Sequence, residues 1–224
     1  MRRIELFRIS GIPIFLDFFF LLIAVLFTWP YWSGGSAAGI SAGFVLVLGL
    51  FVSILLHELG HAWSGRWFGV GTQAIELNGL GGLCYFDRSL PARVLPRTVI
   101  GLAGPFANLV LWQVFDVAAE LARDGGGGLL AMVLRQLSYA NLLLLIFNLL
   151  PAFPLDGGKV LESWLAPLLG PAWSVRVVAI LGLLVAAWLV FRSLPGGMFM
   201  LMLAVLIAVQ NWQMLQSVGG FGRK

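Results

Sequence analysis

The sequence contains few charged residues, two histidines and a single cysteine. Charged side chains make up 11% of its 224 residues, whereas an ordinary soluble domain carries about 25%. So few charges cannot cover the water-facing surface of a protein of this size, so much of the surface must face lipid. The lone Cys84 excludes an intramolecular disulfide framework and a cysteine-rich zinc site. The formal net charge of +4 comes from residues scattered in short loops, which does not indicate nucleic-acid binding.

Long apolar runs are abundant, and they are the length that a membrane helix requires. A spanning helix needs about 20 mostly apolar residues. Six stretches qualify, at roughly 14–32, 40–65, 98–121, 129–150, 174–192 and 197–216. No small-residue cleavage site follows the basic N-terminus, so the first run predicts a retained helix and not a signal peptide. The sequence therefore predicts an all-α polytopic membrane protein in the lipid bilayer with about six transmembrane helices.

The placement of lysine and arginine predicts the orientation of this protein. Cytosolic loops are enriched in both residues. A cytosolic N-terminus puts eleven of them inside and three, Arg123, Arg135 and Arg192, outside. The inside set is Arg2, Arg3, Arg8, Arg66, Arg88, Arg93, Arg97, Lys159, Arg176, Arg223 and Lys224. The distribution predicts that both termini are cytosolic.

Two regions interrupt the helical pattern. Residues 66–97 contain VGTQAIELNGLGGLCYF, which predicts a small β-like membrane-associated segment between the second and third spans. Its glycines Gly79, Gly81 and Gly82 suit either a close approach by a substrate strand or a plain turn. Residues 148–158, NLLPAFPLDGG, cannot continue a helix. Irregular backbone at membrane depth survives only beside protein or a water-filled cavity, so this second break is a candidate site. No long linker divides the chain, which predicts one domain over 1–224.

The clearest chemical motif is His-Glu-x-x-His at residues 57–61, near the end of the second span. Positions i and i+4 share one helix face, so His57 and His61 can bind one metal ion. Glu58 lies about 100° around the helix, where it can act as a base beside the metal. Ionisable groups within a span are costly and usually functional, which favours a metal site over two ordinary core histidines.

A catalytic zinc site usually has three protein ligands, and no third histidine exists. Cys84 and the carboxylates remain, although Cys84 also suits a small apolar core position. Asp156 stands out because the second and fourth spans both end on the inner side, which brings it to the depth of the histidines. An aspartate before a helix is also a common N-cap, so spacing alone leaves both roles open. Asn141 is predicted to make helix-to-helix hydrogen bonds.

HELGH followed by NLLPAFPLDGG closely resembles the site-2 protease family of intramembrane metalloproteases. The resemblance implies that Asp156 is the third zinc ligand and that Asn148 helps to hold the substrate carbonyl or oxyanion. AGPFANLV, residues 103–110, resembles the GPxxN motif of the family and implies a supporting role for Asn108. GLGGLCYF resembles its glycine-bearing strand region. The chain has no room for the PDZ or CBS domains that many relatives carry.

The resemblance and the motif together predict an intramembrane zinc endopeptidase with one Zn²⁺ per chain. His57, His61 and Asp156 would bind the metal, Glu58 would be the general base, and Asn148 would stabilise the oxyanion. The substrate would be a membrane-spanning protein, and the setting a bacterial or archaeal cytoplasmic membrane. Two alternatives stay open: a catalytically silent metal-binding protein or metal transporter, and a different membrane peptidase such as a prenyl-protein processing enzyme.

Overall fold

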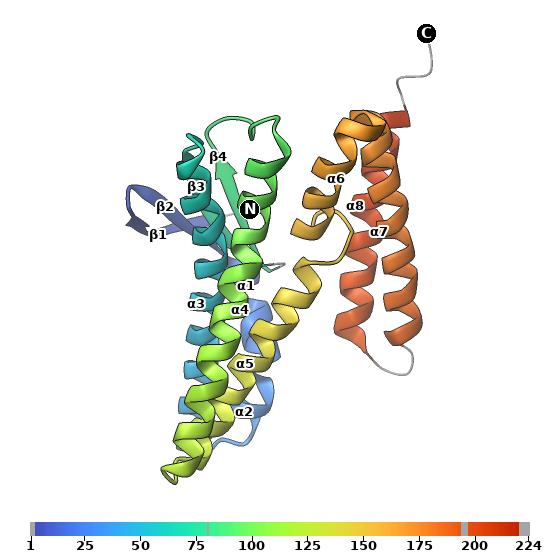
Figure 1. The fold of residues 1–224 in the computed structure, drawn as a ribbon. Helices are drawn as coiled ribbons and strands as arrows, with labels where there is room; N and C mark the ends of the chain where they lie inside the picture. Colours follow the sequence, from blue (N-terminus) through green and yellow to red (C-terminus); the bar gives the residue numbers. More distant parts are fainter. Residues whose placement is uncertain (1–2, 80, 194–196, 220–224) are drawn as a thin grey trace. The chain divides into compact units, whose positions relative to one another are not determined.

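The computed structural model describes residues 3–79, 81–193 and 197–219 (Figure 1). Arg2, Arg223 and Lys224, which contribute to the predicted orientation, and residues 194–196, which lie between the last two predicted spans, are outside the described residues. The strands are β1 (Arg3–Ile9), β2 (Ile12–Asp17), β3 (Thr72–Asn78) and β4 (Gly81–Phe86). The helices are α1 (Phe18–Phe27), α2 (Trp29–Ser33), α3 (Ala37–Trp67), α4 (Val94–Asp124), α5 (Gly128–Asn148), α6 (Asp156–Leu169), α7 (Pro171–Ser193) and α8 (Met198–Gly219).

The chain divides into two compact units. One comprises residues 1–91 and 103–145, and therefore contains the sheet, α3 and most of α4 and α5. The other comprises residues 92–102 and 146–224, and contains α6, α7 and α8. The prediction of a single domain over 1–224 stays a prediction.

A four-stranded sheet in the order β1-β2-β3-β4 lies in the first unit. β2 pairs antiparallel with β1 and parallel with β3, and β3 pairs antiparallel with β4. Ile14, Ile75 and Leu77 are fully buried and pack with Leu59 and Ala62 of α3. The predicted β-like segment is confirmed in β3 and β4, whereas β1 and β2 were not predicted.

The predicted continuous helix over 14–32 is wrong. Residues up to Asp17 belong to β2, and the Asp17 carboxylate accepts a hydrogen bond from Phe19 N (2.7 Å), which caps α1. The ten residues of α1 extend about 15 Å, half of the roughly 30 Å hydrocarbon thickness. The apolar run is thus divided between β2, whose side chains pack in the core, and the short helices α1 and α2.

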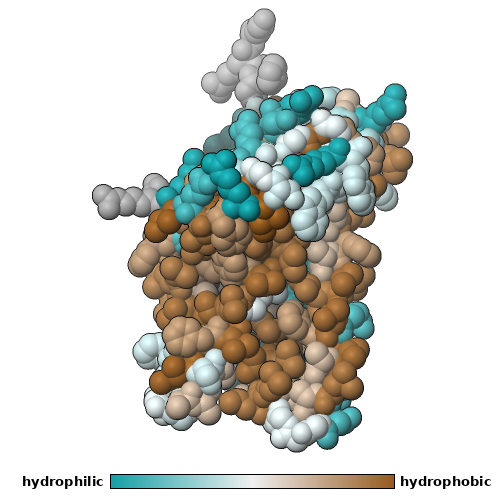
Figure 2. Space-filling model, turned by 90° about the vertical axis from the view of Figure 1, so that its left-hand side faces the viewer, coloured by the Kyte–Doolittle hydropathy of each residue, from teal (hydrophilic) through white to brown (hydrophobic). Residues whose placement is uncertain are grey.

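The other five predicted spans are helices of membrane length. Among the described residues, α3, α4, α5, α7 and α8 are long and apolar enough to cross a bilayer. Large apolar side chains such as Phe44 and Leu48 of α3 point outward, each more than 60% exposed. Figure 2 shows apolar side chains covering most of the viewed face, with hydrophilic side chains gathered toward its ends. The protein is therefore a mostly helical, multi-pass membrane protein with a small sheet.

The second unit contains an antiparallel hairpin of α7 and α8 (Figure 1). Its core includes Ala186 and Leu189 of α7, and Ala204 and Ile207 of α8. Ala152 of the segment before α6 packs into the same cluster. The NLLPAFPLDGG break is thereby anchored on the hairpin.

Candidate metal centre

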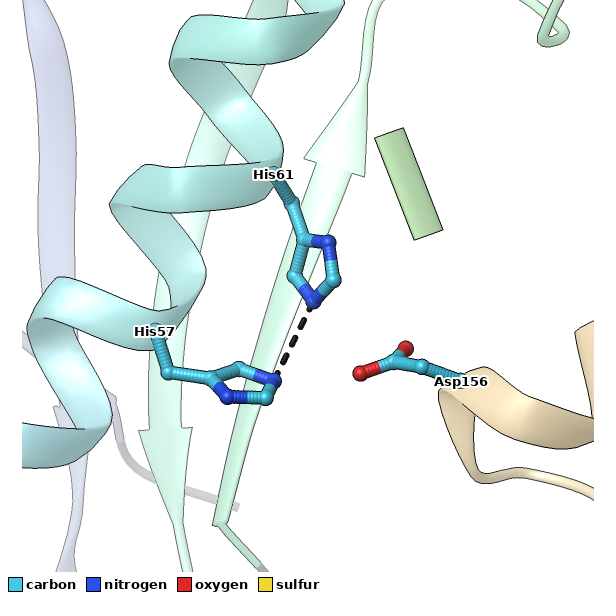
Figure 3. Close-up of side chains that lie close together, drawn as sticks. All are labelled: His57, His61 and Asp156. Atoms are coloured by element: carbon cyan, nitrogen blue, oxygen red, sulfur yellow. Dashed lines mark hydrogen bonds between the residues drawn. The ribbon is translucent and has the colours of Figure 1, made fainter. Parts of the chain in front are cut away.

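The two histidines of the chain lie four residues apart on α3, which is continuous from Ala37 to Trp67. Both side chains are buried, and their Nε2 atoms lie 3.2 Å apart (dashed line in Figure 3). Ligands about 2.0–2.1 Å from a tetrahedral zinc ion lie about 3.3 Å from one another. The spacing of the two nitrogens therefore fits adjacent positions on one zinc ion.

Gly104 of α4 lies directly against the imidazole pair. A Cβ at this position would lie 2.6 Å from His57 Nε2 and 2.7 Å from His61 Cε1, both inside normal contact distance. A second close approach joins the same helices, because a Cβ on Gly60 would lie 2.6 Å from the Ala103 carbonyl oxygen. Glycine is thus required on both helices for the backbones to come this near.

His57 is held on its other nitrogen by an amide. Its Nδ1 lies 2.5 Å from Asn108 Oδ1, and Asn108 in turn donates from Nδ2 to Asn141 Oδ1 (2.9 Å). Asn141 donates to Ser53 Oγ (3.0 Å), which links α5 back to α3. The predicted helix-to-helix hydrogen bonding of Asn141 is confirmed.

Glu58 is buried, and its carboxylate faces β4. A Cβ added to Gly82 would lie 2.6 Å from Glu58 Cδ, so the strand backbone runs directly beside the carboxylate. Gly82, Cys84 and Phe86 alternate along β4 with the exposed Leu83 and Tyr85. Cys84 packs against the core cluster of sheet and α3, as expected for a small apolar side chain.

Asp156 is the first residue of α6 and is buried. The N-cap is Leu155, with no side-chain cap bond, so the alternative of Asp156 as N-cap is wrong. Its Oδ1 accepts a hydrogen bond from Lys159 Nζ (3.1 Å). A carboxylate has two oxygens and about four acceptor positions, so this ion pair leaves Asp156 able to bind a cation as well.

The segment before Asp156 is fixed by Asn211 of α8. The Asn211 side chain accepts from Phe153 N (3.1 Å) and donates to Phe153 O (2.7 Å). Both backbone groups of an irregular segment are satisfied in this way, as burial requires. Sequence reasoning missed Asn211, although an asparagine in an apolar span is a signal that could have drawn attention.

His57, His61 and Asp156 form a group that could hold a metal ion (Figure 3). One potential ligand atom from each residue lies within 4.8 Å of the other two. Two imidazole nitrogens and a carboxylate oxygen are zinc ligands, and a catalytic zinc site commonly has three protein ligands. The donor set therefore fits Zn²⁺. Asn148 is the last residue of α5 and is half-buried, and its role stays a prediction.

The chain is similar in sequence to proteins that carry the name zinc metalloprotease. A zinc metalloprotease of Methanocaldococcus jannaschii is 36% identical over 180 residues, which cover 80% of this chain and 50% of that protein. Rip3 of Mycobacterium tuberculosis is 33% identical over 217 residues, which cover 88% of this chain and 54% of that protein. The chain thus spans about half the length of these curated relatives.

The fold is similar to that of a protein of known structure. The site-2 protease from Methanocaldococcus jannaschii superposes with a TM-score of 0.69 at 28% identity, covering 96% of this chain and 95% of that one. The sequence model of peptidase family M50 matches residues 45–122 and 126–191, a range that includes the histidine pair and Asp156. This chain belongs to peptidase family M50, the site-2 protease family of zinc metalloproteases.

Proposed function

We propose that this chain is an intramembrane zinc endopeptidase that cleaves a membrane-spanning segment of another protein. The observation that carries the proposal is the grouping of His57, His61 and Asp156, with Glu58 adjacent to the first ligand in sequence. A silent metal-binding protein or a transporter needs ligands but has no use for a buried general base beside them. Membership of a peptidase family supports the same reading.

The proposed roles follow from the chemistry of each side chain. His57, His61 and Asp156 would hold the zinc ion, which when bound polarises a water molecule and the scissile carbonyl. Glu58 would accept the proton of the attacking water and pass it to the leaving amine, so that it ends the cycle ionised as it began. Asn148 would donate its side-chain amide to the developing oxyanion.

The position of β4 at the edge of the sheet suggests how a substrate binds. A helical substrate hides its carbonyls in i to i−4 hydrogen bonds, so it must unwind before attack. β4 is an edge strand, and an extended segment that added to this edge would run alongside the strand whose Gly82 lies against Glu58. The proposed substrate is therefore a transmembrane helix that becomes extended locally.

We also propose that both termini are cytosolic and that the membrane is a bacterial or archaeal cytoplasmic membrane. This orientation requires an even number of crossings, so α1 and α2 together must provide a sixth one besides the five long helices. In a Cys84→Ser background, a cysteine at Gly125, between α4 and α5, should react with a membrane-impermeant thiol reagent added to intact cells. A cysteine at Arg93 should not, and the reverse pattern contradicts the orientation.

The decisive test compares the wild-type chain with Glu58→Gln in liposomes that also contain a panel of membrane proteins. Glu58→Gln should retain about one zinc ion per chain and lose about 10² to 10⁴-fold in cleavage rate, the usual contribution of a general base. Asp156→Ala should lose zinc as well as cleavage. Cleavage products are identified by mass spectrometry. Full activity in Glu58→Gln, or a wild-type chain that binds zinc but cleaves nothing, would refute the proposal.

A further inference from the structure

A continuous chain of hydrogen bonds links buried polar groups of α3, α4 and α5. Ser53, Asn108 and Asn141 are each fully buried, although they lie on helices that are apolar elsewhere. Burying a polar side chain is costly unless it forms hydrogen bonds, so these three side chains must find their partners among one another and the nearby backbone. Donors and acceptors follow one another in a single direction along these hydrogen bonds, and the last acceptor faces His57.

The direction is set at Asn141 by a backbone carbonyl. Asn141 Nδ2 donates to Leu137 O (2.9 Å) and to Ser53 Oγ (3.0 Å). A carbonyl can only accept, so turning the amide over would place two acceptor oxygens in contact. Ser53 donates its own hydrogen to Gly49 O (2.7 Å), and so must accept from Asn141. Asn141 Oδ1 is therefore fixed toward Asn108.

The orientation of Asn141 in turn fixes which atom of the Asn108 amide faces His57. Asn108 Nδ2 donates to Asn141 Oδ1 (2.9 Å), which leaves Asn108 Oδ1 facing His57 Nδ1 at 2.5 Å. An amide oxygen only accepts, so the Nδ1 of His57 must carry the proton. A neutral imidazole has one such proton, and the Nε2 of His57 is then unprotonated. This is the nitrogen that faces His61 Nε2 at 3.2 Å.

We propose that Asn108 and Asn141 are positioning residues that hold His57 in the Nδ1–H tautomer and so keep its Nε2 ready to bind the metal. The tautomer is ultimately fixed by the Leu137 carbonyl on α5, through two amides. The inference rests on the proposed zinc site, because the prepared nitrogen is assigned as a ligand there. Groups that orient a metal-binding histidine commonly change metal affinity about 10 to 100-fold when they are removed.

The test measures the tautomer directly in metal-free protein. The chain has only two histidines, so ¹⁵N-labelled histidine gives signals from two rings, and His61→Gln assigns those of His57. Protonated and unprotonated imidazole nitrogens resonate at well-separated frequencies. The wild-type chain should show a protonated Nδ1 and an unprotonated Nε2. Asn141→Leu frees the Asn108 amide to turn over, and should give a mixture of tautomers.

Zinc affinity, measured by competition with a chelator, provides the second readout. Asn108→Leu should weaken binding about 10 to 100-fold, and Asn141→Leu by a smaller factor. Ser53→Ala should retain the tautomer because Leu137 O still orients Asn141. Ser138→Ala is the matched control, because this buried serine on α5 donates a hydrogen bond to Asp116 and is not a member of the hydrogen-bonded set of Ser53, Asn141 and Asn108. Both serine variants should keep zinc affinity within about twofold of the wild type.

A carboxylate at position 108 separates this role from simple packing. Both oxygens of a carboxylate accept, so Asn108→Asp should restore the Nδ1–H tautomer even in the Asn141→Leu background. Wild-type tautomer and zinc affinity in Asn141→Leu, or an Nε2–H tautomer in the wild-type chain, would overturn the inference. Neither result depends on cleavage, so an active protease with the opposite tautomer defeats this inference alone. An inactive chain with the expected tautomer defeats only the proposed function.

Discussion

Replacement of Gly104 by alanine should damage the metal centre more than it weakens the fold. The added Cβ would lie 2.6 Å from His57 Nε2 and 2.7 Å from His61 Cε1, whereas ordinary contact begins near 3.4 Å. The two rings or the α4 backbone must therefore yield by about 0.7 to 0.8 Å at these two contacts, and by more at His61 Nε2, which is the nearest atom of all. Both crowded rings belong to proposed ligands, so this displacement acts directly on their nitrogens.

The expected size of the effect follows from this displacement. Loss of the proper orientation of a ligand commonly costs about 10 to 100-fold in metal affinity. A misplacement of about 1 Å at a reacting centre costs on the order of 10²-fold in rate. Alanine inside a helix is more favourable than glycine by up to about 1 kcal/mol, so α4 itself gains from the change. We expect weaker zinc binding and slower cleavage in a protein whose metal-free form unfolds close to the wild-type temperature, because the gain in α4 offsets much of the strain of overpacking.

The assay combines chelator competition for zinc, cleavage in liposomes and thermal unfolding of the metal-free protein. Gly128→Ala is the matched control, because a Cβ at the start of α5 meets nothing within 4 Å. It should leave zinc affinity and cleavage unchanged. Zinc affinity of Gly104→Ala within about twofold of the wild type would refute the reasoning, since the imidazoles would then tolerate the added methyl group.

Three further predictions test neighbouring parts of the structure. Asn211→Leu removes both partners of the Phe153 backbone and should lower the free energy of unfolding by about 2–4 kcal/mol in denaturant titrations; a loss below about 0.5 kcal/mol contradicts this. Gly82→Ala should push the Glu58 carboxylate aside and reduce kcat about 10 to 100-fold with zinc stoichiometry unchanged, so loss of zinc would contradict the assigned role. Glu162→Gln weakens a partly exposed ion pair with Arg97 (3.2 Å) and should change stability by about 1 kcal/mol or less in the same titrations; a larger loss is incompatible with partial exposure.

Local sequence patterns were sufficient for the parts of the site that lie on one helix. The i, i+4 spacing of His57 and His61 places them on one face whatever the rest of the fold does, and the structure has both rings turned to the same side. The five long helices were also predictable, because length and apolar composition alone decide whether a helix can span. Asp156 was singled out by a backbone break, and its ligand role was implied by family resemblance.

The N-terminal strands could not be predicted from the same patterns. The residues of β2 are buried or half-buried on both faces, so they read as a continuous apolar run and not as an alternation of apolar and polar side chains. Its parallel partner β3 lies about 60 residues away, where Ile14 pairs with Ile75. Local periodicity carries no information about such a partner. A local signal did exist in Asp17, since an N-cap residue inside an apolar run marks a helix start at Phe18.

The hydrogen-bond chain to His57 was beyond sequence reasoning for a different reason. Its members are separated by 51, 33 and 88 residues along the chain, and each contact depends on how one helix is rotated toward the next. Apolar helices in lipid give no pattern that fixes such rotation, because every face can be apolar. Asn108 and Asn141 could be recognised as buried amides, but their direction of donation required the Leu137 carbonyl to be located in space.

The close contacts between α3 and α4 and the hydrogen bonds from Asn141 to His57 both follow from burying the imidazole pair. The imidazole pair is buried, and Gly60 and Gly104 contribute to this burial because the α4 backbone lies directly against the α3 backbone at Gly60 and against the two rings at Gly104. Such close packing leaves little room for water to satisfy the polar atoms it buries. The amides and the Ser53 hydroxyl must therefore satisfy one another, and a chain that ends on backbone carbonyls at Leu137 and Gly49 can do so in only one direction. The burial of the imidazole pair and the orientation of His57 are thus consequences of the same packing between α3, α4 and α5.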